Sequence, residues 1–129
     1  MATIQQFEDL EIWQKAKMVD KLVYELTCRA DFSKDFELVR QIKRTVGSCM
    51  DNIAEGFERG GNKEFIQFLY ISKGSIGETR SQCHRALDKN FINSSEFERL
   101  IADCTELSKR ISSFINYLKK SEYKGDKFK

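Results

Sequence analysis

Four long segments of the chain carry apolar residues at every third or fourth position, and the sequence contains no proline. This spacing places the apolar side chains on one face of an α-helix. Since proline is absent, no residue of the chain has to break these helices. The sustained alternation and the hairpin dipeptides that are typical of β-strands are missing. The sequence therefore predicts an all-α protein.

The predicted helices span residues 9–27, 36–57, 62–90 and 95–118. Gly60 and Gly61 end the second helix, because glycine suits a left-handed C-terminal cap. Asn62 is expected to cap the third helix, and Ser95 with Glu98 predicts a capping box at the start of the fourth. Helices of these lengths with short connections predict an antiparallel, up-down-up-down four-helix bundle.

A chain of 129 residues is long enough for one domain with a single core. We expect the bundle to occupy residues 1–118. Residues 119–129 contain five lysines against one glutamate and one aspartate, and they predict a basic, flexible tail. No apolar run approaches the roughly 18 residues of a membrane span. The N-terminus lacks the pattern of a signal peptide, so the expected compartment is the cytoplasm, without contact to a membrane.

Cysteine and histidine usage argues against a metal or a cofactor. The four cysteines, Cys28, Cys49, Cys83 and Cys104, fall on or near apolar helix faces and form no CxxC pair, so we expect reduced, buried thiols. His84 is the only histidine. One imidazole cannot supply a two-histidine zinc site or the paired Glu-x-x-His motifs of di-metal bundles.

The second predicted helix carries an unusual polar stripe. Thr45, Ser48 and Asn52 lie opposite the apolar Val46, yet these residue types are poor helix formers. A helix face in water normally carries Lys, Glu and Gln instead. We therefore expect the stripe, which Gln41 and Glu55 extend, to be a packed polar seam rather than a solvated face.

Other helices also carry more contact surface than one bundle core needs. Trp13 lies away from the apolar stripe of the first helix, and Ser75 and Glu78 lie beside that of the third. Gly74 lies among them, although glycine in a helix interior costs about 1 kcal/mol relative to alanine. Glycine is usually kept where backbones approach closely. These surfaces indicate self-association.

Three stretches of the sequence resemble the 23S rRNA intervening-sequence protein family: "DLEIWQKA" (9–16), "QIKRTVGSCMDNIAEG" (41–56) and "EFIQFLYISKGSIGE" (64–78). The resemblance runs in order from about residue 7 to residue 118. The second stretch is the most specific, since Gln41, Arg44, Ser48, Asn52 and residues 53–56 match its pattern. Two places depart from the family: the chain reads Ser48-Cys49-Met50 where many members read Ser-Ile-Pro, and Ile71-Ser72 where many read Ile-Ala.

The resemblance implies a bundle that assembles into a homopentamer around a central axis. Members are encoded in insertions of bacterial 23S rRNA genes or elsewhere in bacterial genomes. A similar bundle is the accessory protein of diversity-generating retroelements, which works with a reverse transcriptase and nucleic acid. The polar stripe would then face a neighbouring subunit. The expected oligomer interface comprises Trp13, Gln41, Thr45, Ser48, Asn52, Glu55, Ser75 and Glu78.

Basic side chains off the core suggest association with structured RNA or DNA. Arg40, Lys43 and Arg44 lie on the second helix, and Lys73 and Arg80 lie near His84 on the third. Several copies in one oligomer would multiply a weak patch. Two alternatives stay open: the charges serve solubility only, because acidic residues balance those of the second helix, or the protein is a scaffold that binds another protein.

Nothing in the sequence converges on a catalytic site. The "GFERGG" stretch lacks the Lys-Ser/Thr of a phosphate-binding loop, and no Ser or Cys has an evident base. Glu55 and Glu78 fit seam or surface groups, paired with Arg44 or Arg80, better than a carboxylate pair that binds a metal. We therefore expect a protein without enzymatic activity.

Overall fold

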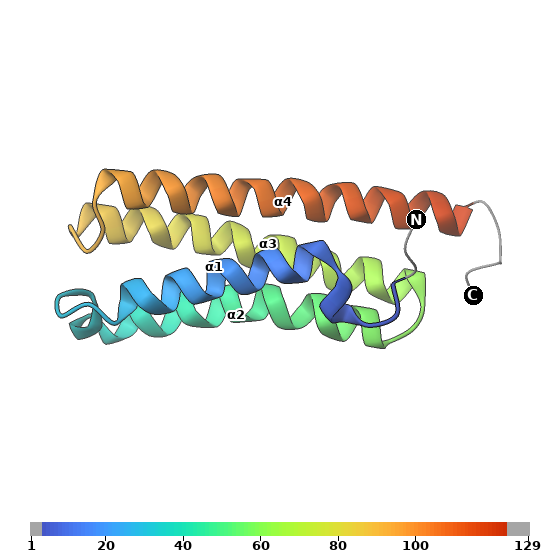
Figure 1. Cartoon of the computed structure of the whole chain (residues 1–129), viewed down its shortest axis with the longest axis horizontal. Coiled ribbons are helices and arrows are strands. Elements are labelled where there is room, and N and C mark those ends of the chain that lie inside the picture. The colour runs from blue at the N-terminus through green and yellow to red at the C-terminus, as the bar shows by residue number, and fades with distance from the viewer. Residues whose placement is uncertain (1–3, 124–129) are drawn as a thin grey trace.

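The computed structural model describes residues 4–123 of the chain, and in this range it contains helices and no strand (Figure 1). The four α-helices are α1 (Glu11–Thr27), α2 (Phe36–Glu58), α3 (Asn62–Asp88) and α4 (Ser94–Tyr123). Two short 3-10 helices, η1 (Phe7–Asp9) and η2 (Phe32–Lys34), precede α1 and α2. The all-α prediction is confirmed. No helix in this range is long and apolar enough to cross a membrane.

The end of α4 differs from its predicted position. The helix continues to Tyr123, through residues 119–123 that the sequence assigned to a flexible tail. Its last turns still follow the apolar period, and Leu118 is buried. The other residues of that predicted tail, 124–129, lie outside the described range.

Helix ends are set by side-chain caps and by one glycine. Gly60 has a φ of 85°, which confirms the left-handed cap predicted after α2. The capping box of α4 lies two residues before its predicted position. The Glu96 amide donates to Asn93 Oδ1 at 2.8 Å, and the Asn93 amide donates to Glu96 Oε1 at 2.9 Å. Asn62 is the first residue of α3 rather than its cap, because Gly61 has the extended backbone of an N-cap.

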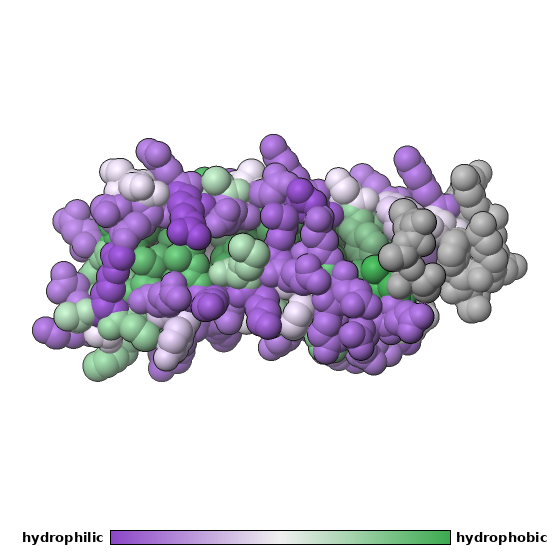
Figure 2. Space-filling view, viewed as in Figure 1, coloured by the Kyte–Doolittle hydropathy of each residue, from purple (hydrophilic) through white to green (hydrophobic). Residues whose placement is uncertain are grey.

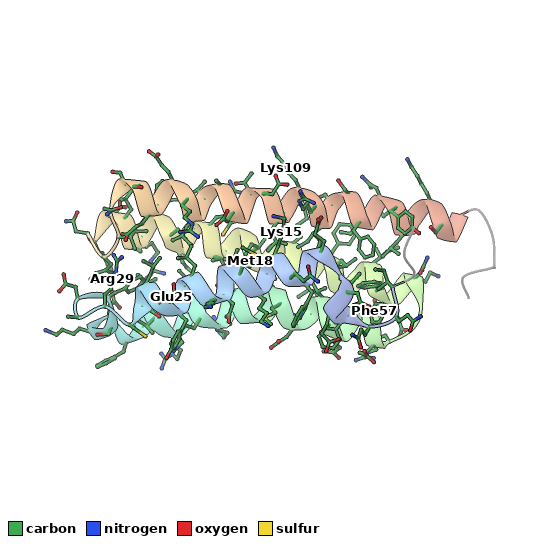
Figure 3. The ribbon with its side chains drawn as sticks, viewed as in Figure 1. Lys15, Met18, Glu25, Arg29, Phe57 and Lys109 are labelled. Atoms are coloured by element: carbon green, nitrogen blue, oxygen red, sulfur yellow. The ribbon has the colours of Figure 1, made fainter. Side chains whose placement is uncertain are left out.

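The four helices lie side by side around one apolar core (Figure 1). The α2–α3 contact is the most extensive, α3 also packs on α4, and α1 packs mainly on α2. The α1–α4 contact is the least extensive of these four. Figure 2 shows apolar residues exposed along this edge between polar ones. Ion pairs span the edge near both ends of α1, between Glu11 and Arg110 and between Arg29 and Glu96. Figure 3 labels Arg29 at one of these ends.

Short polar side chains form the contact between α2 and α3. Thr45 Oγ1 donates to Gln82 Oε1 at 2.7 Å and lies 3.0 Å from Thr79 Oγ1. One turn further along α2, Ser48 Oγ lies 3.0 Å from Ser75 Oγ. Residue numbers rise on α2 as they fall on α3, so these two helices run antiparallel.

At Thr45 and Ser48 the polar stripe is thus a packed seam, and α3 of the same chain is its partner. Thr45 is only 2% exposed and Ser75 is also buried. Thr45 and Ser75, which we expected at an oligomer interface, are thus buried within a single chain. Their hydroxyl groups have hydrogen-bond partners within the chain. These side chains are small, so the two helices can approach closely. One turn further along α2, Asn52 donates to the Ser48 carbonyl at 2.8 Å within the same helix.

Replacing Thr45 with valine tests the seam. Valine has the same shape but leaves Gln82 and Thr79 with one partner fewer, so Thr45→Val should lower the free energy of unfolding by about 1–3 kcal/mol. Urea denaturation followed by circular dichroism measures this change. Thr105→Val, at a half-buried position of α4, is the matched control and should change it by less than about 0.5 kcal/mol. Equal stability of Thr45→Val and the parent protein would contradict the assigned role of the hydroxyl.

At Gly56, near the C-terminal end of α2, α3 approaches α2 closely. A Cβ atom at this position would lie 2.7 Å from Phe68 Cβ and 2.9 Å from Phe65 Cδ1. Gly56→Ala should therefore destabilise the protein by about 1–3 kcal/mol through overpacking. Gly47→Ala is the control, because a Cβ there has no neighbour within 4 Å. That change should stabilise the helix by about 1 kcal/mol. Thermal unfolding measures both effects: the midpoint should fall for Gly56→Ala and rise for Gly47→Ala.

Candidate nucleic-acid interface

The five basic residues that the sequence proposes for nucleic-acid binding lie on two helices. Arg40, Lys43 and Arg44 are exposed on α2, whereas Lys73 is half-buried and Arg80 is exposed on α3. None of the five takes part in an ion pair within residues 4–121. Their charges are therefore not neutralised by a direct carboxylate contact in this range.

The structure does not bring these five residues into one patch. Lys43 Nζ lies 5.5 Å from the ring centroid of Tyr24, which belongs to α1. Lys73 and Arg80 share a side of α3 with His84, and the His84 ring packs edge-on against Phe97 of α4 at 4.8 Å. Since α1 borders α2 and α4 borders α3, the two groups lie on different sides of the bundle.

Two exposed aromatic rings accompany the basic residues of α2. Tyr24 is 56% exposed and Phe36, the first residue of α2, is 79% exposed. Phe36, Arg40 and Lys43 follow one another at i, i+4 and i+7, so they share one side of the helix. We call the set Tyr24, Phe36, Arg40, Lys43 and Arg44 the aromatic–basic surface.

Sequence reasoning missed both aromatic members of this surface. Tyr24 lies off the apolar stripe of α1, which marks it as a surface residue, but only the fold shows that Lys43 is its neighbour. From the sequence, Phe36 is predicted only to be the first residue of a helix. Its exposure follows from its place on the outward side of α2, because the core side at this end is filled by Leu38 and Phe32, both fully buried.

Two carboxylates border the aromatic–basic surface. The pKa of Asp20 is raised above its usual value, first by partial burial and then by the negative charge of Asp51, while Lys43 acts in the opposite direction. Asp20 therefore lies within the electrostatic influence of both Asp51 and Lys43. Its carboxylate would oppose a phosphate that approached Lys43.

The remaining residues of the expected oligomer interface lie at or near the surface. Glu55 pairs with Arg59 at 2.7 Å rather than with Arg44 or Arg80. Gln41 Oε1 accepts a hydrogen bond from Arg85 at 2.9 Å, across the outer side of the α2–α3 contact. Ser48 and Asn52 are half-buried, and Glu78 is exposed. Trp13 is half-buried, with its ring centroid 5.1 Å from that of Phe7.

The core disfavours the thiolate forms of Cys49 and Cys104. Burial raises the pKa of Cys49 to about 12. The pKa of Cys104 is also raised, first by a hydrogen bond with Cys83 and then by burial. Cys28 is exposed, so the expectation that all four thiols are buried is wrong for this residue. Its place just after α1 takes it out of the helical period. In the described part of the chain, no three His, Cys, Asp or Glu side chains are grouped to hold a metal ion.

Comparison with known proteins places this fold in a family. The family model of the 23S rRNA-intervening sequence protein matches residues 8–113. A crystal structure of a protein with unknown function from the S23 ribosomal protein family of Bacteroides thetaiotaomicron has a TM-score of 0.73 and 24% identity to the chain. The likeness covers 81% of this chain and 97% of the other, and it shows a shared fold. No curated protein matches the sequence. The chain belongs to the 23S rRNA-intervening sequence protein family.

Proposed function

We propose that this protein is a non-enzymatic bundle that associates with structured RNA, or with another nucleic acid, through the aromatic–basic surface. The observation that carries the proposal is the exposed Tyr24 ring with the Lys43 ammonium group 5.5 Å from its centroid, beside Arg40 on the next helix. Rings and cations in this arrangement offer the two contacts that proteins make with unpaired nucleotides.

Each part of this surface supplies a different interaction. Tyr24 and Phe36 expose ring faces on which a base can stack, and stacking is worth about 1–3 kcal/mol per base. Arg40, Lys43 and Arg44 reach phosphate oxygens, so binding is salt-dependent. Bases are free to stack only where they are unpaired. The preferred ligand is therefore a structured RNA with an exposed loop or bulge.

We further propose that the bundle has up-down-up-down connectivity and that it works as a homopentamer in the cytoplasm. A stripe on the outer side of α3 supports self-association. Ile71 is 51% exposed, and a Cβ atom on Gly74, one turn later, would have no neighbour within 4 Å. Glu78, which is also exposed, follows at i+7 from Ile71 on the same side of α3. Five copies would present five aromatic–basic surfaces and so strengthen weak individual contacts.

Paired substitutions test the RNA assignment. The double variant Arg40→Gln with Lys43→Gln should make the negative slope of log K against log salt less steep by about 1.4–1.8, if both residues contact phosphate. Tyr24→Ala should weaken binding by about 5- to 150-fold. Fluorescence anisotropy with a labelled stem-loop of ribosomal RNA, titrated from low to moderate salt, measures both.

The matched control is Lys73→Gln with Arg80→Gln, which removes the same charge from the α3–α4 side. It should leave affinity and salt slope unchanged. Equal losses from both pairs would mean that binding depends on net charge alone. Absence of binding by the parent protein at low salt would refute the proposal and favour a protein-binding scaffold, whose partner a pull-down would retain after nuclease treatment.

Native mass spectrometry tests the pentamer. The parent protein should give five-chain ions, and Gly74→Arg should give monomers with unchanged helical circular dichroism, because a side chain at Gly74 has open space within the chain. Met18→Arg, on the exposed side of α1 (Figure 3), is the control and should leave the pentamer intact. A monomeric parent protein, or a pentameric Gly74→Arg variant, would contradict this interface.

A further inference from the structure

A groove with a volume of about 610 Å³ lies where the start of α1 meets the C-terminal half of α4. Apolar groups form most of its surface, and exposed Asp9 and Glu11 lie at its edge. Its lining residues are Ile4, Leu10, Ile12, Phe114 and Tyr117, with Asp9, Glu11, Arg110 and Ser113. This site is separate from the aromatic–basic surface, which lies toward the C-terminal end of α1 and the N-terminal end of α2.

A series of aromatic contacts leads into the groove. Phe57 of α2 meets Phe65 of α3 at 6.0 Å, and Phe65 meets Phe114 of α4 at 5.5 Å, both edge to face. Phe114 then stacks on Tyr117 at 5.9 Å with an angle of 10° between the rings. Tyr117 ends the series with 49% of its surface exposed. The groove therefore offers a partly exposed aromatic ring to a further aromatic side chain.

The C-terminal residues 124–129 contain one aromatic side chain, Phe128, and they are long enough to bring it to the groove. Phe128 follows Tyr123, the last helical residue of α4, by five positions, and five extended residues span about 17 Å. Tyr117 lies about 9 Å back along the helix from Tyr123, and Phe114 about 14 Å. Gly125 can adopt the backbone conformations that reverse the chain direction at this point.

Charge also fits this occupant. Lys127 and Lys129 flank Phe128 in the sequence. At the groove, Glu11 already pairs with Arg110, while the neighbouring Glu8 and Asp9 are exposed acidic groups of η1. Phe128 between two lysines thus complements an apolar groove that has acidic residues beside it. The attraction of such exposed charges is modest and adds to the burial of the ring.

We propose that Phe128 docks into this groove of its own chain, stacking on Tyr117, with Lys127 and Lys129 beside Glu8 and Asp9. The docked segment would cover apolar surface that the described residues leave open. The inference does not depend on the proposed nucleic-acid binding, because it uses other residues at the opposite end of α1.

Photocrosslinking of the full chain tests this assignment. A p-benzoylphenylalanine introduced in place of Phe128 should, on irradiation, crosslink to peptides that contain Ile4, Leu10, Phe114 or Tyr117, in a product with the mass of one chain. Tyr117→Ala in the same protein should reduce this crosslink by about two- to tenfold, as expected for the loss of one aromatic contact. The same probe in place of Phe36 is the control and should give no groove crosslink.

Three outcomes would overturn the proposal. Crosslinks at the groove that join two chains would assign it to the tail of a second copy. Crosslinks to other surfaces, or to added RNA, would assign Phe128 another partner. Absence of any protein crosslink while circular dichroism shows a folded bundle would mean that the segment does not dock. Hydrogen exchange gives an independent measurement, since Phe128→Ala should speed exchange at residues 10–12 and Phe36→Ala should not.

Discussion

The close contact between α2 and α3 determines where the other parts of the molecule lie. Hydroxyl groups at Thr45, Ser48 and Ser75 let these two helices approach while every polar group keeps a partner. Among the described residues, no buried side-chain nitrogen or oxygen lacks a hydrogen bond. With this pair fixed, α1 packs beside α2 and α4 beside α3. The basic residues of the two helices are thereby directed to separate sides.

Much of the fold follows from the sequence because helices depend on local patterns. The spacing of apolar residues predicts the four helices, and Gly60 has the left-handed backbone that its position predicts. The capping box of α4 is displaced because Asn93 and Glu96 form the reciprocal hydrogen bonds two residues earlier, and Arg29 also binds Glu96. Such competition between neighbouring caps cannot be decided from propensity alone.

The partner of the polar stripe could not be predicted for a different reason. A packed seam of Thr45, Ser48 and Asn52 looks the same in sequence whether it faces a helix of its own chain or of another. The family resemblance suggested another subunit, but the register of α2 against α3 places Thr79 and Gln82 there. Likewise, Tyr24 and Lys43 are 19 positions apart, and no local pattern reports that they meet across α1 and α2. Long-range neighbours of this kind depend on the rotation of each helix about its axis.

The edge between α1 and α4 has a consequence for how the molecule opens. Its ion pairs, Glu11–Arg110 and Arg29–Glu96, involve partly exposed groups. Such pairs contribute little each and weaken as salt screens them, whereas the hydroxyl seam on the other side of the bundle is buried and responds little to ionic strength. The contribution of the α1–α4 ion pairs to stability therefore varies with the surrounding electrolyte, whereas that of the hydroxyl seam does not. Because the α1–α4 contact is also the least extensive of the four, we expect local unfolding to begin there, while α2 and α3 remain together.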